Sequence, residues 1–211
     1  VGIHRSDAQY KVGPYQLDRK PLDTGPTWVD HLARHTELSE VVRVRVYLTE
    51  RGASSAMIKS TENAARRESD VLGRIKHPGV VQLKQYHPSG HLSRPALIFD
   101  YHPETLRLGQ YLIRYGDKLD ILTRISLVRQ LAETLRWAHA SRIHHRTLSA
   151  HSVHVVPTAA KGGGEDARWF NPRLQISDWQ IAVRHVDAEQ AGTGRRFAPT
   201  SLSINHVSDT A

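Results

Sequence analysis

The stretch Leu-Ala-Glu-Thr-Leu-Arg-Trp-Ala-His-Ala-Ser-Arg-Ile-His-His-Arg-Thr-Leu-Ser-Ala-His-Ser-Val-His-Val, residues 131–155, decides the fold. Its first part continues a predicted helix that runs from Asp120 to Ser141, and its last part enters a short apolar strand, Val153 to Pro157. Between them lies a loop of histidines, serines and one arginine. One apolar helix face is predicted from Ile121, Ile125, Val128, Ala132, Leu135 and Ala138.

The residues on either side extend this helix–loop–strand unit in two directions. Downstream, a small strand Leu174 to Ile176 leads into Asp178, and upstream the pattern is dominated by strands with one helix. Residues 158–172, with three consecutive glycines, are predicted to be a flexible insertion. The remaining predicted elements are short strands and turns in 10–35, strands at 42–48, 80–86 and 96–101, and helices at 56–75 and 106–114.

Composition narrows the class of protein. The 211 residues suit one domain, or one domain cut short, and 39% are hydrophobic, enough for a core. The absence of cysteine excludes disulfides and thiolate metal sites, and it fits a reducing cytoplasm. Neither a run of roughly 20 apolar residues nor a signal-peptide pattern in residues 1–9 is present, so no membrane partner is expected. The first residue is Val1, not Met, so we expect the chain to be excised from a longer protein.

The net charge of +8 favours anionic partners, and nucleic acid is one candidate. The alternative is that the basic residues are scattered and keep the surface solvated, because no run of five occurs. A basic face for nucleic acid would comprise Arg43, Arg45, Arg66, Arg67, Arg74 and Lys76. A further alternative is a metal site among His139, His144, His145, His151 and His154, although their spacing matches no zinc motif.

Three motifs in order resemble those of the protein kinase fold. His145, Arg146 and Leu148 match the catalytic-loop signature H-R-D-L-x-x-x-N. Residues 178–180, Asp-Trp-Gln, are similar to the D-F-G motif after its strand. Residues 67–81, from Arg-Glu to His-Pro-Gly-Val-Val, are similar to the kinase αC helix and the turn after it. The resemblance covers about residues 15–182.

More narrowly, residues 147–150, Thr-Leu-Ser-Ala, and the Asp-Trp-Gln segment resemble kinase modules of bacterial phage-defence proteins. These are serine/threonine kinases of the phage-growth-limitation (BREX-type) kind, in which a nuclease-related domain is fused to kinase modules.

The resemblance implies an α+β fold with two lobes. Residues 1–101 would form a β-rich amino-terminal lobe with its helix at about 56–75, and residues 102–182 a partial helical lobe. Residues 183–211 would be an activation-segment-like tail, in which Ala198-Pro199-Thr200 is similar to A-P-E and Ser201, Ser203 and Thr210 are candidate phosphoacceptors. The helical lobe is expected to be incomplete.

The resemblance also implies where the catalytic groups have been replaced. Thr147 stands at the catalytic aspartate, and Ser152 stands at the asparagine that holds the second Mg²⁺. Arg45 takes the position of the β3 lysine, and Glu68 that of the αC glutamate with which it would pair. Asp178 is the retained metal ligand.

The nucleotide site is altered as well. Only Gly25 remains of the glycine-rich loop, with Asp23 and Trp28 at glycine positions, where an acid would repel phosphate and a Trp would fill its space. Weak binding of ATP and Mg²⁺ would go through Arg45 and Asp178, with Asp178 and a degenerate Ser152 as metal ligands. The hinge that would hold adenine is Phe99, Asp100, Tyr101 and His102.

These losses predict a pseudokinase, a regulatory or scaffold module with weak or no phosphotransfer, in a bacterial serine/threonine kinase or defence protein. Its partner would be an adjacent kinase domain or another protein. Two alternatives stay open. One is a divergent but active ATP-dependent serine/threonine kinase, and the other is a basic nucleic-acid-binding module.

Overall fold

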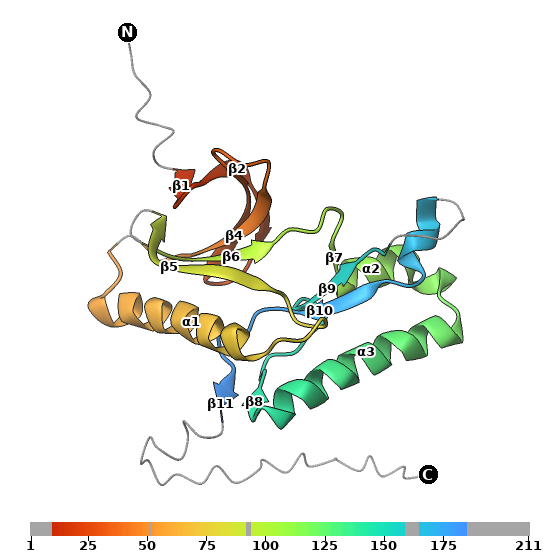
Figure 1. Ribbon diagram of the computed structural model, residues 1–211. Coiled ribbons are helices and arrows are strands. Elements are labelled where there is room, and N and C mark those ends of the chain that lie inside the picture. The colour runs from red at the N-terminus through yellow and green to blue at the C-terminus, as the bar shows by residue number, and fades with distance from the viewer. Residues whose placement is uncertain (1–9, 51, 92–93, 159–164, 185–211) are drawn as a thin grey trace, which may run out of the picture.

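A computed structural model describes residues 10–50, 52–91, 94–158 and 165–184. The chain forms two parts, with a curved sheet and helix α1 in the first half and helices α2 and α3 with small strands in the second (Figure 1). The α+β order with strands first and helices second is as the sequence predicts. The predicted phosphoacceptors and the A-P-E-like segment lie outside the described residues.

The first half is built on one six-stranded sheet in the order β1-β2-β3-β4-β6-β5, with antiparallel neighbours throughout. Its central strand β4 alternates valine with arginine and is buried from its second residue onward. Both side-chain rows of β4 are therefore covered, and its arginines face the interior. The strands are β1 (Lys11–Val12), β2 (Tyr15–Thr24), β3 (Trp28–His35), β4 (Val41–Tyr47), β5 (Leu83–His91) and β6 (Arg94–Asp100).

Helix α1 (Ser55–Arg74) covers the face of the sheet nearer the second half (Figure 1). Ser54 caps it, because its side-chain oxygen accepts a hydrogen bond from the Met57 N–H. The face that packs inward carries Ala65, Val71 and Leu72 together with a buried carboxylate, Glu68. A charged residue on an apolar helix face requires a partner, and this one points to the site between the two halves.

The second half combines four helical segments with two small sheets. Strands β7, β9 and β10 form one sheet in the order β10-β9-β7, and β8 pairs with β11 in the other. Asp120 caps α3 by accepting from the Thr123 N–H. The elements are β7 (Leu106–Arg107), α2 (Leu108–Tyr115), η2 (Gly116–Lys118), α3 (Ile121–Ala140), β8 (Ile143–His144), β9 (Val153–Val156), η3 (Glu165–Trp169), β10 (Arg173–Ile176) and β11 (Val183–Arg184).

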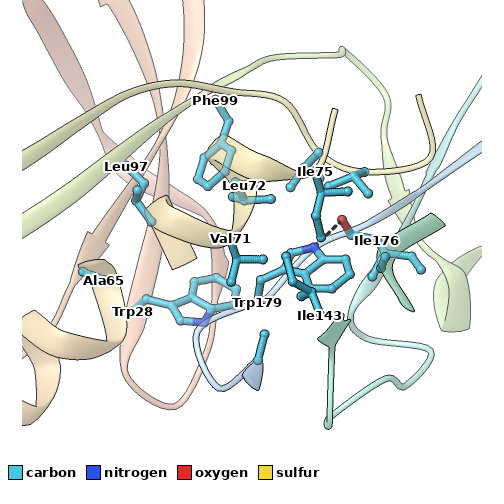
Figure 2. Close-up of a cluster of buried hydrophobic side chains, with 14 of the residues drawn as sticks. Trp28, Ala65, Val71, Leu72, Ile75, Leu97, Phe99, Ile143, Ile176 and Trp179 are labelled. Carbon is cyan, nitrogen blue, oxygen red and sulfur yellow. Dashed lines mark hydrogen bonds between the residues drawn. The ribbon is translucent and has the colours of Figure 1, made fainter. Parts of the chain in front are cut away.

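One apolar cluster joins the two halves (Figure 2). Trp179 is fully buried in it, and its indole N–H donates to the Ile176 carbonyl at 3.1 Å. Around it lie α1 residues such as Leu72, the strand residue Phe99 and, from the second half, Ile143. Because the halves share this core, the site between them has rigid walls.

Three predicted details are corrected. The predicted face of α3 is wrong over most of its length, since Ile121, Ile125, Val128 and Ala132 are exposed, and the buried positions are Leu127, Thr134 and Ala138. Strand β5 begins at Leu83 and runs on to His91, so most of the predicted loop before β6 is a hairpin. The described part of the insertion is not simply flexible: η3 forms there, and Trp169 is buried against α2.

Among the described residues, no helix combines the length and the apolar character that crossing a membrane requires.

Gly79 sets how closely the loop after α1 approaches α3. A Cβ added there would lie 1.9 Å from Oγ1 of Thr134. We therefore expect Gly79→Ala to lower the free energy of unfolding by about 1–3 kcal/mol, as overpacking does. Urea denaturation checks this, and Thr134→Ala in the same chain should recover part of the loss. A double variant as unstable as Gly79→Ala alone would contradict this packing.

Candidate functional site: an ion-paired cleft between the two halves

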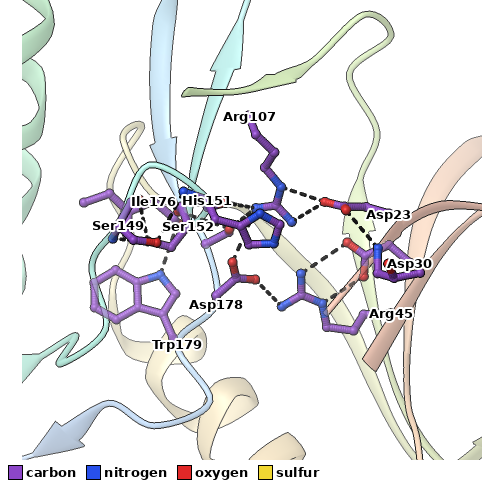
Figure 3. A network of polar contacts seen from close by, with 12 residues as sticks. Asp23, Asp30, Arg45, Arg107, Ser149, His151, Ser152, Ile176, Asp178 and Trp179 are labelled. Atoms are coloured by element: carbon purple, nitrogen blue, oxygen red, sulfur yellow. Dashed lines mark hydrogen bonds and ion pairs between the residues drawn. The ribbon is translucent and has the colours of Figure 1, made fainter. Parts of the chain in front are cut away.

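Arg45 is the centre of the cleft between the sheet and the second half (Figure 3). Its guanidinium is fully buried and meets three carboxylates. Nε donates to Oδ1 of Asp30 at 2.8 Å, and Nη1 lies 2.7 Å from Oδ1 of Asp178 and 3.3 Å from Oε1 of Glu68. One buried cation thus links strand β3, helix α1 and the segment after β10.

Glu68 holds that arrangement from the side of α1. It accepts a hydrogen bond from the Tyr47 hydroxyl and another, at 3.1 Å, from the backbone N–H of Trp179. Each carboxylate oxygen therefore has a donor besides Arg45, which is what a buried charge needs. The contact with Trp179 fixes α1 relative to the Asp-Trp-Gln segment.

Asp178 is bound from two sides by arginines. Arg45 reaches Oδ1, and Nη1 of Arg107 lies 3.4 Å from Oδ2 (Figure 3). Asp178 has a φ of 64°, an uncommon left-handed conformation for a residue other than glycine. Burial favours a raised pKa for Asp178, but the charges of Arg45 and Arg107 outweigh it and lower the pKa below its usual value. The carboxylate is therefore ionised, and both its oxygens are engaged.

Trp28 fills the space under the β2–β3 hairpin. Its ring is almost completely buried, and the guanidinium carbon of Arg45 lies 3.7 Å from the ring centroid, a cation–π contact. The indole also stacks near His151 of the loop before β9, with centroids 6.4 Å apart. A Cβ on Gly25 would lie 2.3 Å from this indole, so the glycine at this turn makes room for Trp28.

The neighbouring part of the cleft is also charged. Arg43 and Asp30 form a buried ion pair of 2.6 Å, and the guanidinium of Arg43 lies 4.3 Å from the centroid of Phe99. Burial alone would raise the pKa of Asp30, but the charges of Arg45 and Arg43 hold it at about 2. The cavity beside this pair has a volume of about 170 Å³, and its walls include Asp100, Tyr101, His102 and His154.

The loop before β9 carries Thr147 at the position where the kinase resemblance predicts a catalytic carboxylate. Thr147 is exposed, and its backbone N–H donates to Nδ1 of His145 at 3.3 Å. The His145 ring, in turn, bonds through Nε2 to the Ser177 carbonyl at 2.7 Å. The Ser152 hydroxyl is held by Ser149, accepting from its N–H at 2.9 Å and donating to its carbonyl at 3.0 Å. These contacts fix the loop backbone and occupy the hydroxyl predicted as a metal ligand.

His154 gives the cleft a measurable pH dependence. Burial and then the nearby charges of Arg43, Arg107 and Arg45 hold its pKa well below 6.5. Below about pH 6.5 the unfolded chain binds a proton at this side chain and the folded chain does not, so stability falls as the pH falls.

We expect His154→Gln to flatten the loss of stability between about pH 6.5 and 5, by up to about 1.4 kcal/mol per pH unit. Urea denaturation at several pH values checks this. His139→Gln, on the exposed side of α3, is the control. Identical slopes for His154→Gln and the parent would contradict the expected burial of a neutral imidazole.

The cleft gathers most of the predicted site residues. Arg45, Glu68 and Asp178 meet through direct contacts, and the hinge Asp100 to His102 lines the adjoining cavity. Thr147 and Ser152 lie in the loop before β9, where the Thr147 N–H donates to His145 and the Ser152 hydroxyl bonds to Ser149. Gly25 supports Trp28.

Three charged residues of the cleft were not predicted as parts of it: Asp30, Arg43 and Arg107. Asp30 and Arg45 are directly opposite each other on β3 and β4. The sequence shows an acidic and a basic residue in two neighbouring predicted strands. Only the register of these strands, which the sequence does not give, shows that the two residues face each other. Arg107 is seventy-one residues from Asp178, and no local pattern connects the two.

The predicted basic face is corrected. Arg43 and Arg45 are buried in ion pairs, so they do not form one surface with the exposed Arg66, Arg67 and Arg74. Within the described ranges, no three histidine or acidic side chains gather as a metal site would require.

A curved antiparallel sheet with one helix, a helical second half and a buried charge cluster between them define a protein kinase-like domain. The chain belongs to the family described as protein tyrosine and serine/threonine kinases, whose model matches residues 34–202. The fold and the family predicted from the three motifs are therefore confirmed.

Individual relatives extend this result. The chain is 62% identical over its whole length to "Probable kinase PglW" of Streptomyces coelicolor, covering 14% of that protein. It is 30% identical over 70% of its length to serine/threonine-protein kinase pkn1 of Chlamydia caviae, covering 22% of it. It is 26% identical over 69% of its length to Aurora kinase A-A of Xenopus laevis, covering 33%. The chain thus spans a third or less of each of these relatives.

Proposed function

We propose that this chain is a pseudokinase module, in which a kinase fold is kept as a regulatory or scaffold element with weak or no phosphotransfer. The observation that carries the proposal is the state of the cleft. Trp28 lies under the glycine-loop hairpin against Arg45, and Asp178 is bound by two arginines. Phosphates and a metal ion would have to displace these buried side chains.

Phosphoryl transfer depends on positioning and on charge neutralisation by metal ions. A metal at Asp178 would compete with Arg45 and Arg107 for both carboxylate oxygens. The Ser152 hydroxyl is a neutral group already bonded twice to Ser149. Mg²⁺ prefers hard oxygen ligands such as free carboxylates. These residues therefore fit a Mg²⁺ ion poorly.

Proton transfer has lost its acceptor as well. Thr147 has no carboxylate, and a positioned base contributes roughly 10²–10⁴-fold to the rate. At about 1.4 kcal/mol per tenfold, its loss alone raises the barrier by roughly 3–5 kcal/mol. The cavity where adenine would bind is altered as well. The buried Asp30–Arg43 ion pair lines this cavity and places charge where the flat adenine ring would have to pack.

A second candidate, a divergent but active serine/threonine kinase, has one observation in its favour. Arg45, Glu68 and Asp178 are assembled as the catalytic lysine, glutamate and aspartate of a kinase must be. The same contacts equally hold a scaffold together, since each carboxylate is neutralised without a ligand. The basic nucleic-acid-binding alternative loses support from the burial of Arg43 and Arg45.

The biological setting that we propose is a bacterial, cytoplasmic defence protein. The support is the 62% identity to "Probable kinase PglW" together with the resemblance of the motif segments to phage-defence kinase modules. In such a protein the module would dock an adjacent kinase domain or another protein partner. The fixed position of α1, tied by Glu68 to Arg45 and Trp179, offers a rigid surface for this.

Transfer of labelled phosphate from ATP tests the proposal. The full-length protein and its Asp178→Ala variant are compared for labelling of the protein itself and of a generic substrate. Asp166→Ala, on the exposed turn η3, is the matched control. We expect the same incorporation in all three proteins. Incorporation that Asp178→Ala abolishes and Asp166→Ala leaves intact would overturn the proposal and establish an active kinase.

A further inference from the structure

Arg107 has more polar contacts than a structural arginine at the start of a helix needs. It lies in β7, just before α2, and its side chain reaches into the cleft between Asp23 and Asp178 (Figure 3). Its side chain is only 8% exposed. A buried guanidinium needs ion-pair and hydrogen-bond partners that offset the cost of removing it from water.

Its contacts come from both halves of the molecule. From the first half, Asp23 near the end of β2 accepts from Nε at 2.7 Å and lies 2.6 Å from Nη2. From the second half, Nη1 donates to the His151 carbonyl at 2.7 Å and to the Ser177 hydroxyl at 2.9 Å, and lies 3.4 Å from Asp178. One planar guanidinium therefore links the β2–β3 hairpin, the loop before β9 and the Asp-Trp-Gln segment.

Charge explains the choice of an arginine. Asp23, Asp30, Glu68 and Asp178 place four carboxylates around the cleft, and Arg45 with Arg43 supplies only two cations. Arg107 adds the third, next to Asp178, the residue at which a kinase holds a metal ion that bridges to phosphate. Its fork has the donors to bind Asp23 with two nitrogens while a third reaches across, which a lysine cannot do.

We propose that Arg107 is a built-in cation that takes the place of a metal-bound nucleotide: it neutralises Asp178 and ties the β2–β3 hairpin to the second half, so that the closed cleft needs no ligand. This inference deepens the proposed function, because it names the regulation of the same cleft. It makes the position of the hairpin a property of the chain and not a response to nucleotide.

Peptide-resolved hydrogen–deuterium exchange of the full-length protein without nucleotide tests the link. In Arg107→Met we expect residues 22–28 to exchange about tenfold or more faster, as the loss of charge-assisted hydrogen bonds should cause. Residues 121–140 of α3 should exchange as before. Arg114→Met, an exposed arginine on α2, is the matched control and should leave residues 22–28 unchanged.

Asp23→Asn is the second variant, chosen because Asp23 is partly exposed and because asparagine keeps the shape of the side chain while removing its charge. It should accelerate the same residues, and combining it with Arg107→Met should add less than the sum of the two effects. Parent-like exchange of residues 22–28 in both variants would overturn the inference, and so would fully additive effects. Neither result bears on the pseudokinase proposal. That proposal is overturned by phosphate transfer that depends on Asp178.

Discussion

Arg45→Met should lower the free energy of unfolding by about 3–5 kcal/mol. The substitution removes the only cation that contacts Glu68 in the described cleft and takes one arginine each from Asp30 and Asp178. Breaking a buried ion pair by deleting one partner leaves an uncompensated buried charge, which is where this cost arises. Urea denaturation at neutral pH measures it.

Arg34→Met is the matched control for this prediction. Arg34 is on the neighbouring strand β3, its side chain is 63% exposed, and its ion pair with Asp18 spans 3.9 Å. Exposed pairs of this kind contribute about 0–1 kcal/mol. If Arg45→Met were no more destabilising than Arg34→Met, the charge cluster would not be the structural centre that the geometry indicates.

Trp28→Ala should be comparably damaging, with a loss of about 3–5 kcal/mol. The indole is 1% exposed, and its removal leaves a cavity beneath the hairpin and ends the cation–π contact with Arg45. Thermal or urea denaturation measures the loss. A Trp that merely covered the surface of an open nucleotide site would cost much less.

Trp137→Ala provides the comparison within the same residue type. Trp137 is on α3 and is 48% exposed, and its ring centroid lies 5.7 Å from that of His77. Its loss should destabilise the chain by less than half as much as Trp28→Ala. Equal losses for the two variants would indicate that Trp28 does not fill the interior of the cleft.

Much of the fold could be predicted from the sequence because the residues that begin and end its helices and strands act locally. Helix α1 was placed within a residue at each end, since its apolar residues recur at helical spacing and the His-Pro-Gly turn follows it. The motif residues His145 and Asp178 indicated the order of the elements between them. Apolar spacing on α3 gave the helix but not its buried face, because Ile121 and Ile125 fit the same period and are exposed.

The candidate site could be predicted only where a motif marks it. Arg45, Glu68 and Asp178 were found through their positions in known motifs. The Asp30–Arg43 pair depends on the register of two strands, and the Arg107 contact with Asp23 joins residues 84 positions apart. Such contacts are set by tertiary packing, and no periodicity in the chain reports them. They are also the contacts that distinguish a cleft filled by its own side chains from one that awaits a ligand.

The most direct test of a self-filled cleft is hydrogen–deuterium exchange of the full-length protein with and without saturating ATP and Mg²⁺. Three segments bound the cleft: residues 22–30, 99–102 and 176–180. The account predicts the same exchange in all three with and without nucleotide, because we propose that Trp28, Arg45 and Arg107 take the places that phosphate and metal would need. Joint protection of the three segments by ATP and Mg²⁺ would contradict it.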